Sequence, residues 1–374
     1  MANDFFMHIV QLLPELNEGG VERGVVEVNR ELVRRGVAST VISAGGRLVA
    51  RIEADGGRHA ACDVCSKNPL TFAWRSRKLR RLLAALAPDL VHVRSRVPAW
   101  LLRAANRDLR LPVVTTVHGL NHPGVYSRIL TRADRVICVS RAVRDHLQRH
   151  YGTPDAVLRV IHRGLDPSAF DPARLDAAFL ERFRREHGLE GRFVAVSVGR
   201  LTPLKDYETF IRGVAAARRE APEILGLIVG GSRAGRGGYA ARLRSLVAAA
   251  DADAVRFAGS QQAMAEVYTL SDVAVSCSRK PESFGRTLVE ALAMETPVIA
   301  TAHGGALEIV REGVDGFLFP PGDADALARR LLEVRGRTFA NLRTDALARF
   351  SLDRMVDATL AVYREVLAGR ESIA

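Results

Sequence analysis

Two carboxylates separated by seven residues are the first feature of this sequence that could do chemistry. Glu282 and Glu290 lie in the stretch KPESFGRTLVEALAMETPVIAT, residues 280–301. The pattern predicts a loop that carries Glu282 and a helix over 284–294 that carries Glu290 among apolar residues. A carboxylate in such surroundings is costly unless it is hydrogen-bonded, and its two oxygens match vicinal hydroxyls such as those of a ribose. The competing interpretations are a Glu290 that lies on the helix surface or pairs with a neighbouring arginine, and a Glu282 that serves as a helix N-terminal charge.

Two nearby groups could bind an anion at the ends of predicted strands. The backbone N–H groups of Phe284 and Gly285, at the start of the same helix, favour a phosphate or a polar sugar edge. Arg200 and Lys205 stand in one short loop, GRLTPLKD, where a guanidinium fork and an ammonium group could hold a diphosphate. Taken alone, this stretch favours the interpretation of the two cations as solvated loop residues.

The first half of the chain offers a matching pair of features. Gly19 and Gly20 directly precede a predicted helix, and paired glycines leave backbone N–H groups open for an anion or a sugar hydroxyl. His118 comes just past another predicted strand, in TTVHGLNHP. A turn needed only for chain geometry and a structural histidine are the competing interpretations.

The length and composition of the chain limit the number of domains, the kinds of ligand and the cellular location that we expect. A chain of 374 residues is longer than those that usually fold around a single hydrophobic core, so we expect two domains. The balance of 54 Lys and Arg against 42 Asp and Glu gives a net charge of +12, which suits a polyanion, an anionic membrane face or phosphorylated ligands. We expect a cytoplasmic protein, because the sequence shows no secretory pattern, no membrane-spanning apolar run and no disulfide framework. Cys62 and Cys65 form one C-x-x-C, which we interpret as two half-buried strand residues rather than a metal or redox site.

A basic amphipathic helix is predicted over 72–86, where WRSRKLRRLLAALA places leucines on one face and cations on the other. Such a helix can lie on anionic lipid, which would make the protein peripheral on the cytoplasmic face of the inner membrane. An ordinary surface helix with solvated arginines is the alternative, and the sequence leaves both open.

The elements that must position these residues are parallel βα units, because short apolar runs alternate with helical patterns. A polar, proline-marked segment at 162–176 separates two such series, so we expect one doubly wound, Rossmann-like domain over 1–168 and another over 169–350. A helix over 351–369 should pack back on the first domain. Ligands of such sheets bind beyond the carboxyl ends of the strands, so the candidate residues should face a cleft between the domains. The predicted strands are 8–14, 38–43, 89–93, 113–118 and 135–140, then 193–200, 225–231, 255–259, 272–277, 297–301 and 316–320.

Taken together, these motifs resemble the family 4 glycosyltransferases, which have the α/β GT-B fold. The resemblance rests on the early Gly-Gly, T-x-H-G, G-R-L-x-x-x-K, E-S-F-G-x-x-x-x-E-A-L-A and G-G-x-x-E-I-V, which together span nearly the whole chain. The stretches LPELNEGGVERG and CSKNPLTF are most similar to a bacterial subgroup linked to lipopolysaccharide or other surface polysaccharide assembly.

The resemblance implies a retaining glycosyltransferase that moves a sugar from a nucleotide-sugar donor to a glycolipid or saccharide acceptor. The first domain would bind the lipid-linked acceptor and the second the nucleotide-sugar. No metal and no other cofactor would be needed.

The same resemblance implies roles for single residues. Glu282 would contact the donor sugar, and Glu290 would contact the nucleotide ribose. Arg200 and Lys205 would bind the diphosphate and stabilise the leaving nucleotide, and His118 would orient the transferring sugar. The other residues with an implied role in binding the nucleotide-sugar are Gly19, Gly20, Phe284 and Gly285.

The chain departs from the family pattern in two places. HRGLD at 162–166 stands where many relatives have N-G-V-D, and a longer basic loop at 230–239 replaces G-D-G-P, which leaves phosphate contacts there open. Two D-x-D triplets, at 251–253 and 323–325, could bind a metal in another glycosyltransferase class. Both lie in alanine-rich contexts, and we interpret them as helix caps.

Three other functions fit the sequence less well than a transferase. A nucleotide-sugar epimerase is disfavoured by the combination of the two-glutamate motif with G-R-L-x-x-x-K. A nucleic-acid-binding protein would explain the positive charge, but no aromatic stacking pattern or binding motif accompanies it, so we expect no nucleic-acid partner. A non-catalytic GT-B-fold binding protein would not need intact His118, Lys205 and Glu282.

Overall fold

The computed structural model describes residues 7–17, 19–232 and 237–371, and they form two compact units. Unit 1 holds the described residues up to Gly164 together with those from Leu352 onward, and unit 2 runs from Leu165 to Ser351. Each unit is built on a parallel sheet, which confirms the predicted α/β class with two Rossmann-like parts. No helix in the described parts of the chain combines the length and apolarity needed to cross a membrane.

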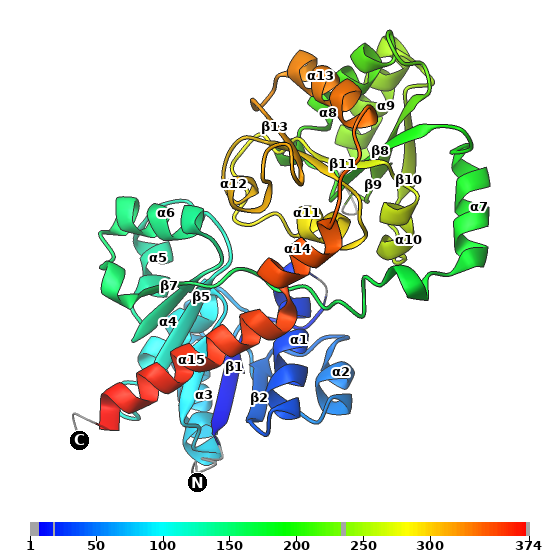
Figure 1. Cartoon of the computed structure of the whole chain (residues 1–374). Helices are drawn as coiled ribbons and strands as arrows, with labels where there is room; N and C mark the ends of the chain where they lie inside the picture. The colour runs from blue at the N-terminus through cyan, green and yellow to red at the C-terminus, as the bar shows by residue number, and fades with distance from the viewer. Residues whose placement is uncertain (1–6, 18, 233–236, 372–374) are drawn as a thin grey trace. The chain divides into compact units, whose positions relative to one another are not determined.

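Within the described residues, unit 1 has a seven-stranded parallel sheet in the order β3-β2-β1-β4-β5-β6-β7 (Figure 1). Its strands are β1 (His8–Leu12), β2 (Ala38–Ser43), β3 (Arg58–Ala61), β4 (Leu90–Val93), β5 (Val113–Val117), β6 (Arg135–Cys138) and β7 (Leu158–Val160). The strand order reverses between β1 and β4, where Gln11 lies opposite His92. Residues that follow these two strands therefore meet at one edge of the sheet.

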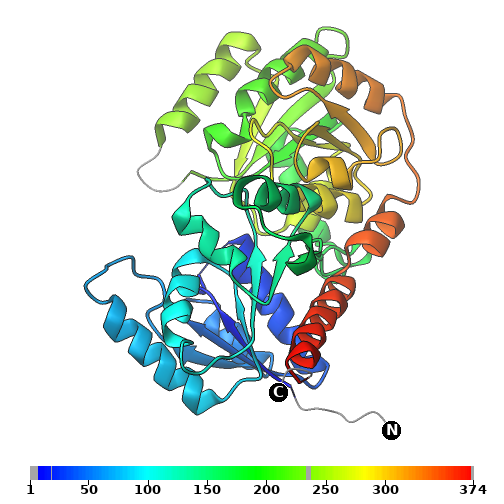
Figure 2. The ribbon, with the colours of Figure 1, turned by 90° about the vertical axis from the view of Figure 1, so that its left-hand side faces the viewer.

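Helices cover both faces of this sheet. They are α1 (Gly20–Arg34), α2 (Val49–Ala54), α3 (Phe72–Leu86), α4 (Arg96–Ala105), α5 (Val125–Arg128), α6 (Arg141–Tyr151) and α15 (Leu352–Glu371), with 3₁₀ turns η1 (Ile129–Thr131) and η2 (Asp155–Val157). Figures 1 and 2 show α15 running along the face that α1 also covers, with α3 on the opposite face. Val356 and Tyr363 of α15 are buried in one hydrophobic cluster with Ile9 of β1, which ties the end of the chain to its beginning.

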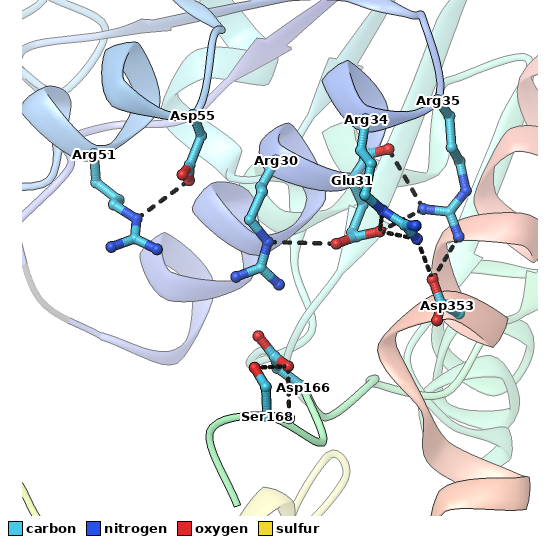
Figure 3. Close-up of polar contacts among 9 residues, drawn as sticks. All are labelled: Arg30, Glu31, Arg34, Arg35, Arg51, Asp55, Asp166, Ser168 and Asp353. Atoms are coloured by element: carbon cyan, nitrogen blue, oxygen red, sulfur yellow. Dashed lines mark hydrogen bonds and ion pairs between the residues drawn. The ribbon is translucent and has the colours of Figure 1, made fainter.

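An ion-pair network also holds α15 against α1 (Figure 3). Glu31 of α1 is nearly buried, and its carboxylate pairs with Arg30 at 3.3 Å and with Arg34 and Arg35 at 2.7 Å each. Arg34 and Arg35 also pair with Asp353 of α15, each at 2.8 Å. Glu31 is therefore the shared acceptor that orients the guanidinium groups between the two helices.

Replacing Glu31 with glutamine is expected to lower the free energy of unfolding by about 1–3 kcal/mol, because three guanidinium groups lose their shared carboxylate. Asp55→Asn is the matched control, since Asp55 pairs with the exposed Arg51 at 3.3 Å (Figure 3). Surface pairs of that kind contribute about 0–1 kcal/mol. Chemical denaturation measures both variants, and equal losses would show that the network does not stabilise the junction of α1 and α15.

The predicted basic helix is confirmed as α3, but one of its cations is not on the surface. Leu79 and Leu83 face the protein interior, as the pattern predicts. Arg75 lies on the same buried face and is 2% exposed. Its guanidinium donates to the carbonyl oxygens of Ser66 and Asn68 at 2.8 and 2.9 Å, so Arg75 holds the preceding loop and is not a solvated arginine.

The part of unit 2 that the structure describes contains a six-stranded parallel sheet in the order β10-β9-β8-β11-β12-β13. Its strands are β8 (Phe193–Val198), β9 (Ile224–Val229), β10 (Val255–Gly259), β11 (Val273–Ser276), β12 (Val298–Thr301) and β13 (Gly316–Phe319). Its helices are α7 (Ala177–His187), α8 (Tyr207–Ala217), α9 (Gly237–Ala250), α10 (Met264–Thr269), α11 (Arg286–Ala293), α12 (Ala306–Ile309), α13 (Ala324–Arg335) and α14 (Leu342–Phe350), with 3₁₀ turns η3 (Pro172–Arg174) and η4 (Pro203–Lys205). The strand order reverses between β8 and β11, so the segments after these strands are neighbours.

The expected elements differ from the structure mainly at their ends. The strands β3 and β7 were not predicted, because they are short and lack a clear apolar pattern. The helix expected over 284–294 is α11, and it begins at Arg286, because Gly285 before it has φ +108°, outside the helical region. The segment interpreted as a linker is partly structured in unit 2, where the Leu165 N–H donates to the Phe350 carbonyl at 2.8 Å.

Candidate functional site

The strand reversal in unit 2 brings two of the predicted segments together. Gly199 to Lys205 follow β8, and Cys277 to Gly285 follow its neighbour β11. Residues that are 77 positions apart in the chain therefore share one edge of the sheet. Open parallel sheets bind their ligands at this point.

Lys205 and Glu282 form an ion pair at this edge. The Lys205 Nζ lies 2.5 Å from Glu282 Oε1, and both side chains are about one quarter exposed, at 27% and 25%. The Ser278 hydroxyl donates to the same carboxylate oxygen. Burial raises the pKa of Glu282, but the charge and hydrogen bond of Lys205, the Ser278 hydroxyl and the nearby His303 outweigh burial and hold this pKa below its usual value. Glu282 is thus a fixed carboxylate whose second oxygen is available to a ligand hydroxyl.

A glycine pair fixes the backbone around Glu282. The Gly305 N–H donates to the Glu282 carbonyl at 2.8 Å. A Cβ on Gly304 would lie 2.5 Å from that same carbonyl oxygen, and a Cβ on Gly305 would lie 2.2 Å from the Phe284 carbonyl oxygen. The G-G-x-x-E-I-V motif is therefore needed for close backbone packing. It places His303, whose two ring nitrogens find no hydrogen-bond partner in the described chain, next to Glu282.

Arg200 and Lys205 share one loop but differ in their surroundings. Lys205 is held by Glu282, whereas the exposed Arg200 makes no hydrogen bond or ion pair with the residues that the structure describes. The loop thus offers one fixed and one free cation at the end of β8. Their assignment to a diphosphate stays a prediction.

Glu290 lies on α11 and is 13% exposed. Its Oε1 accepts from Arg286 Nε at 2.9 Å, and its Oε2 accepts from the hydroxyl of the fully buried Tyr268 at 3.2 Å. Burial and the Glu290 charge raise the pKa of Tyr268 well above its ordinary value, so this hydroxyl stays a donor. A carboxylate oxygen can accept more than one hydrogen bond, which a contact between Glu290 and a ribose hydroxyl would require. The predicted alternative in which Glu290 pairs with a neighbouring arginine is confirmed by its contact with Arg286. The contact with a ribose stays a prediction.

The two residues before α11 can offer a ligand only their backbone. The Phe284 side chain is 4% exposed and meets Phe350 edge to face at 5.6 Å between ring centroids, so its ring belongs to the core. Gly285 has φ +108°, a conformation that L side chains rarely adopt. Any contact of these two residues with a ligand must come from the main chain.

Glu290→Ala is expected to weaken the affinity for free UDP or GDP by about 10- to 100-fold, because ribose hydroxyls lose their charged acceptor. Tyr268→Phe is the control, since it removes one donor to Glu290 and leaves the carboxylate in place. We expect it to lower stability by about 1 kcal/mol with little loss of affinity. Calorimetric titration measures both variants, and an unchanged affinity in Glu290→Ala would exclude the ribose role.

In unit 1, the predicted residues follow β1 and β5. Gly20 begins α1, and a Cβ added there would meet no protein atom within 4 Å, so the chain's own packing does not require a glycine. A Cβ on Gly19 would meet the flexible Glu22 carboxylate at 2.3 Å. His118 follows β5, and its Nδ1 lies 3.3 Å from Nη1 of Arg163, whose Nη2 donates to the Gly20 carbonyl at 2.7 Å. Arg163 therefore connects the two predicted features.

Burial lowers the pKa of His118 well below its ordinary value, and the charges of Arg163 and Arg94 lower it further. His118 is therefore neutral at physiological pH. A neutral imidazole can orient a sugar hydroxyl by hydrogen bonding, which is the role that the sequence predicted. That role stays a prediction.

The acidic triplets and the C-x-x-C have structural explanations. The triplet at 323–325 is a helix cap as predicted, because Asp323 caps α13 by accepting from the Ala326 N–H at 2.8 Å. Asp251 directly follows α9, where its N–H donates to the Val247 carbonyl at 3.0 Å, so 251–253 lies at a helix end as predicted; the Asp251 carboxylate pairs with Arg218 at 2.7 Å. Cys62 and Cys65 lie in the loop after β3 and not within a strand, which corrects that expectation. Among the residues described, no three His, Cys, Asp or Glu side chains are grouped to hold a metal.

Sequence reasoning missed several partners of the predicted residues. Ser278 follows β11 by two positions and His303 directly precedes the glycine pair, so their places at strand ends could have identified them. Tyr268 and Arg163 carry no such signal, because they meet Glu290 and His118 only through the fold. The basic loop at 230–239 lies partly outside the described residues, which exclude 233–236.

Comparisons with known proteins identify relatives of both units. The family model described as "Glycosyltransferase Family 4" matches residues 18–169, and "Glycosyl transferases group 1" matches residues 180–336. A protein of Geodermatophilus obscurus named D-inositol 3-phosphate glycosyltransferase is 30% identical over 386 residues, covering 92% of this chain and 84% of that protein.

Solved structures agree with these matches. A crystal structure of a glycosyltransferase from Rickettsia africae ESF-5 superposes with a TM-score of 0.86 at 29% identity and covers 96% of this chain and 98% of that one. The Anabaena protein HepE, in complex with UDP and glucose, superposes with a TM-score of 0.82 at 23% identity, covering 95% of this chain and 99% of that one. At that identity, the second likeness shows the fold alone.

Proposed function

The chain belongs to the family 4 glycosyltransferases and has the GT-B fold, and on that premise we propose that it transfers a sugar from a nucleotide-sugar to a lipid-linked saccharide. Unit 2 binds the donor through Arg200, Lys205, Glu282 and Glu290. Unit 1 receives the acceptor. The relatives are named glycosyltransferases, which favours transfer over the epimerase alternative.

The observation that carries this proposal is the Lys205–Glu282 ion pair beside the free Arg200. Cleavage of the bond between a sugar and a diphosphate develops negative charge on the leaving phosphate. A cation that is already held where this charge develops stabilises it without reorganising, and such groups are usually the largest single contribution to catalysis; Lys205, held by Glu282, would serve in this way, with Arg200 in the same loop. Glu282, held by Lys205 and Ser278, would accept from a donor-sugar hydroxyl and align the sugar with those cations.

We propose retention of the anomeric configuration without a bound metal. A retaining hydrolase uses a free carboxylate as nucleophile. In the proposed scheme Glu282, held through one oxygen by Lys205 and Ser278, accepts from a donor-sugar hydroxyl through the other oxygen and is not assigned the role of nucleophile. We therefore favour attack by the acceptor on the same face from which the nucleotide leaves, on an oxocarbenium-like centre. In this scheme the cations of unit 2 neutralise the leaving group.

For the acceptor, we propose a lipid-linked saccharide of lipopolysaccharide or surface polysaccharide assembly, reached at the cytoplasmic face of the inner membrane. The support is an exposed apolar and basic surface at α3. Leu70 and Trp74 are 90% and 60% exposed. Lys78 Nζ lies 5.8 Å from the Trp74 ring centroid, and the exposed Arg77 and Arg81 have no ion-pair partner in the described chain. Aromatic and basic side chains together suit an anionic lipid interface.

Replacing Arg77, Lys78 and Arg81 with glutamine is expected to lower the affinity for anionic vesicles by about 100-fold, since each cation near such a surface contributes about 1 kcal/mol. The control replaces three exposed arginines of α7 with glutamine, which changes the net charge equally; these are Arg182, Arg184 and Arg185. Sedimentation with phosphatidylglycerol vesicles compares the two variants with the parent. Equal losses of vesicle affinity in both variants would show that binding depends on the net charge of the protein and not on α3.

The donor is identified by measuring free-nucleotide release from a panel of nucleotide-sugars, with and without a bacterial membrane lipid extract. Because the relative from Geodermatophilus obscurus is named for D-inositol 3-phosphate, that compound is included as a second acceptor. Release from one donor, raised by an acceptor, is the expected result. A protein that binds a nucleotide but releases none with any acceptor would support the non-catalytic alternative.

A further inference from the structure

A buried arginine lies at the strand reversal of unit 1 and has no role in the proposal above. Arg94 directly follows β4, and its backbone N–H donates to the Leu12 carbonyl of β1 at 2.9 Å. The side chain is 8% exposed. Its Nη2 donates to Oε1 of the fully buried Gln11 at 2.6 Å. This is the position in unit 1 that corresponds to the Lys205–Glu282 edge in unit 2, where sheets of this kind bind ligands.

The charge of Arg94 is not balanced within the described chain. Gln11 is a neutral partner, and no carboxylate pairs with Arg94 among the residues described. The Arg94 Nε and the Gln11 Nε2 are buried without a hydrogen-bond partner there. A buried guanidinium with one neutral partner costs several kcal/mol in general, and unmatched donors add to that cost. A bound anion could satisfy these donors, which belong to two side chains joined by the Arg94–Gln11 hydrogen bond.

The surroundings of Arg94 form a narrow pocket with a second cation. Thr116, His118 and Arg163 line it, together with Gly24 of α1. A Cβ on Gly24 would lie 2.3 Å from Arg163 Nη2, so the glycine leaves room for that guanidinium. His118 is neutral, which leaves the pocket with two arginine charges and no acidic lining residue. The pocket suits the oxygens of one small anionic group and is too narrow for a sugar ring.

We propose that Arg94, Gln11 and Arg163 bind a phosphate or carboxylate group of the acceptor, so that the acceptor is an anionic saccharide or an anionic lipid-linked sugar. This inference rests on the proposed transferase function. The donor diphosphate is the other source of the same chemistry, and the experiment below separates the two.

The test uses inorganic phosphate as the probe, at constant ionic strength set with chloride. Phosphate at millimolar concentration should raise the melting temperature of the parent by a few degrees, because a ligand that binds the folded state stabilises it. Arg94→Met should lose this response. Arg149→Met, which removes an exposed arginine of α6, should keep it. Without phosphate, Arg94→Met should be at least as stable as the parent, because an unbalanced buried charge has been removed.

Several outcomes would overturn the inference. An equal response to phosphate in Arg94→Met and the parent would exclude Arg94 as the site, and no response in the parent would exclude the site itself. If Arg94→Met is much less stable than the parent or does not fold, Arg94 is a structural residue and the inference fails.

To distinguish a donor anion from an acceptor anion, the thermal unfolding measurements with phosphate are repeated in saturating UDP. If the phosphate response persists, the site is independent of the donor diphosphate, as the inference requires; if UDP abolishes the response, the anion belongs to the donor. In turnover with the lipid extract, Arg94→Gln should raise the KM for acceptor at least tenfold with the donor KM unchanged. UDP binding that is unchanged in Arg94→Met leaves the proposed function intact whatever the phosphate result.

Discussion

Lys205→Met is expected to lower the rate of sugar transfer by about 100- to 1,000-fold, because the leaving diphosphate loses a fixed cation. Methionine keeps the length and apolar body of the side chain, so the loop after β8 should retain its conformation. Binding of free UDP should fall less than the rate, because the charge on the leaving phosphate is greatest in the transition state. The variant therefore separates ground-state binding from transition-state stabilisation.

The control is Lys280→Met, two residues before Glu282, where the side chain is exposed and has no partner within the described residues. Steady-state rates with the identified donor compare the two variants with the parent. Equal rates for Lys205→Met and the parent would show that Lys205 serves only to hold Glu282. Equal losses in both variants would point to a general effect of charge near the site.

Glu282→Gln is expected to lower transfer by a similar factor of about 100 to 1,000, for a different reason. The amide has nearly the same shape, but it offers one acceptor oxygen in place of two and leaves Lys205 without a charged partner. The Ser278 hydroxyl and Lys205 then compete for that oxygen with the donor sugar. Glu186→Gln, on the exposed face of α7, is the control for loss of a carboxylate.

The same variant should change how stability depends on pH. The folded-state pKa of Glu282 is lowered, so the ion pair contributes stability above the unfolded-state pKa of about 4.3 and loses it as the pH falls through the folded value. The stability difference between the parent and Glu282→Gln should thus be largest near neutral pH and shrink below about pH 4. Urea denaturation across that range measures it. A difference that grows with acidity would show that Glu282 is protonated in the folded protein.

The fold and the segments that form the site could be predicted from the sequence, because both depend on local patterns. Parallel strands appear as apolar runs, and polar residues directly after them must lie at one edge of a sheet. This was enough to place Arg200, Lys205 and Glu282 together. It could not predict that Lys205 would pair with Glu282 while Arg200 stays free, because that choice depends on side-chain positions set by the order of strands.

The residues that were missed depend on contacts between distant segments. Tyr268 reaches Glu290 from another helix, so no spacing in the sequence connects them. Arg75 fits the charge pattern of a surface helix, and only the path of the preceding loop turns it inward. Arg94 follows a strand end like the predicted residues, but its single neutral partner becomes apparent only when β1 lies beside β4.

Transferase activity and the role of Glu282 are tested most directly by measuring transfer of a labelled sugar from the identified donor to a lipid extract, by the parent and by Glu282→Gln. The parent is expected to move label from the nucleotide-sugar into the extracted lipid fraction, and Glu282→Gln is expected to move almost none. Label that stays in the donor with both proteins, although both bind the nucleotide, would contradict a catalytic role and indicate a binding protein with the transferase fold. Equal transfer by both would contradict the assignment of Glu282.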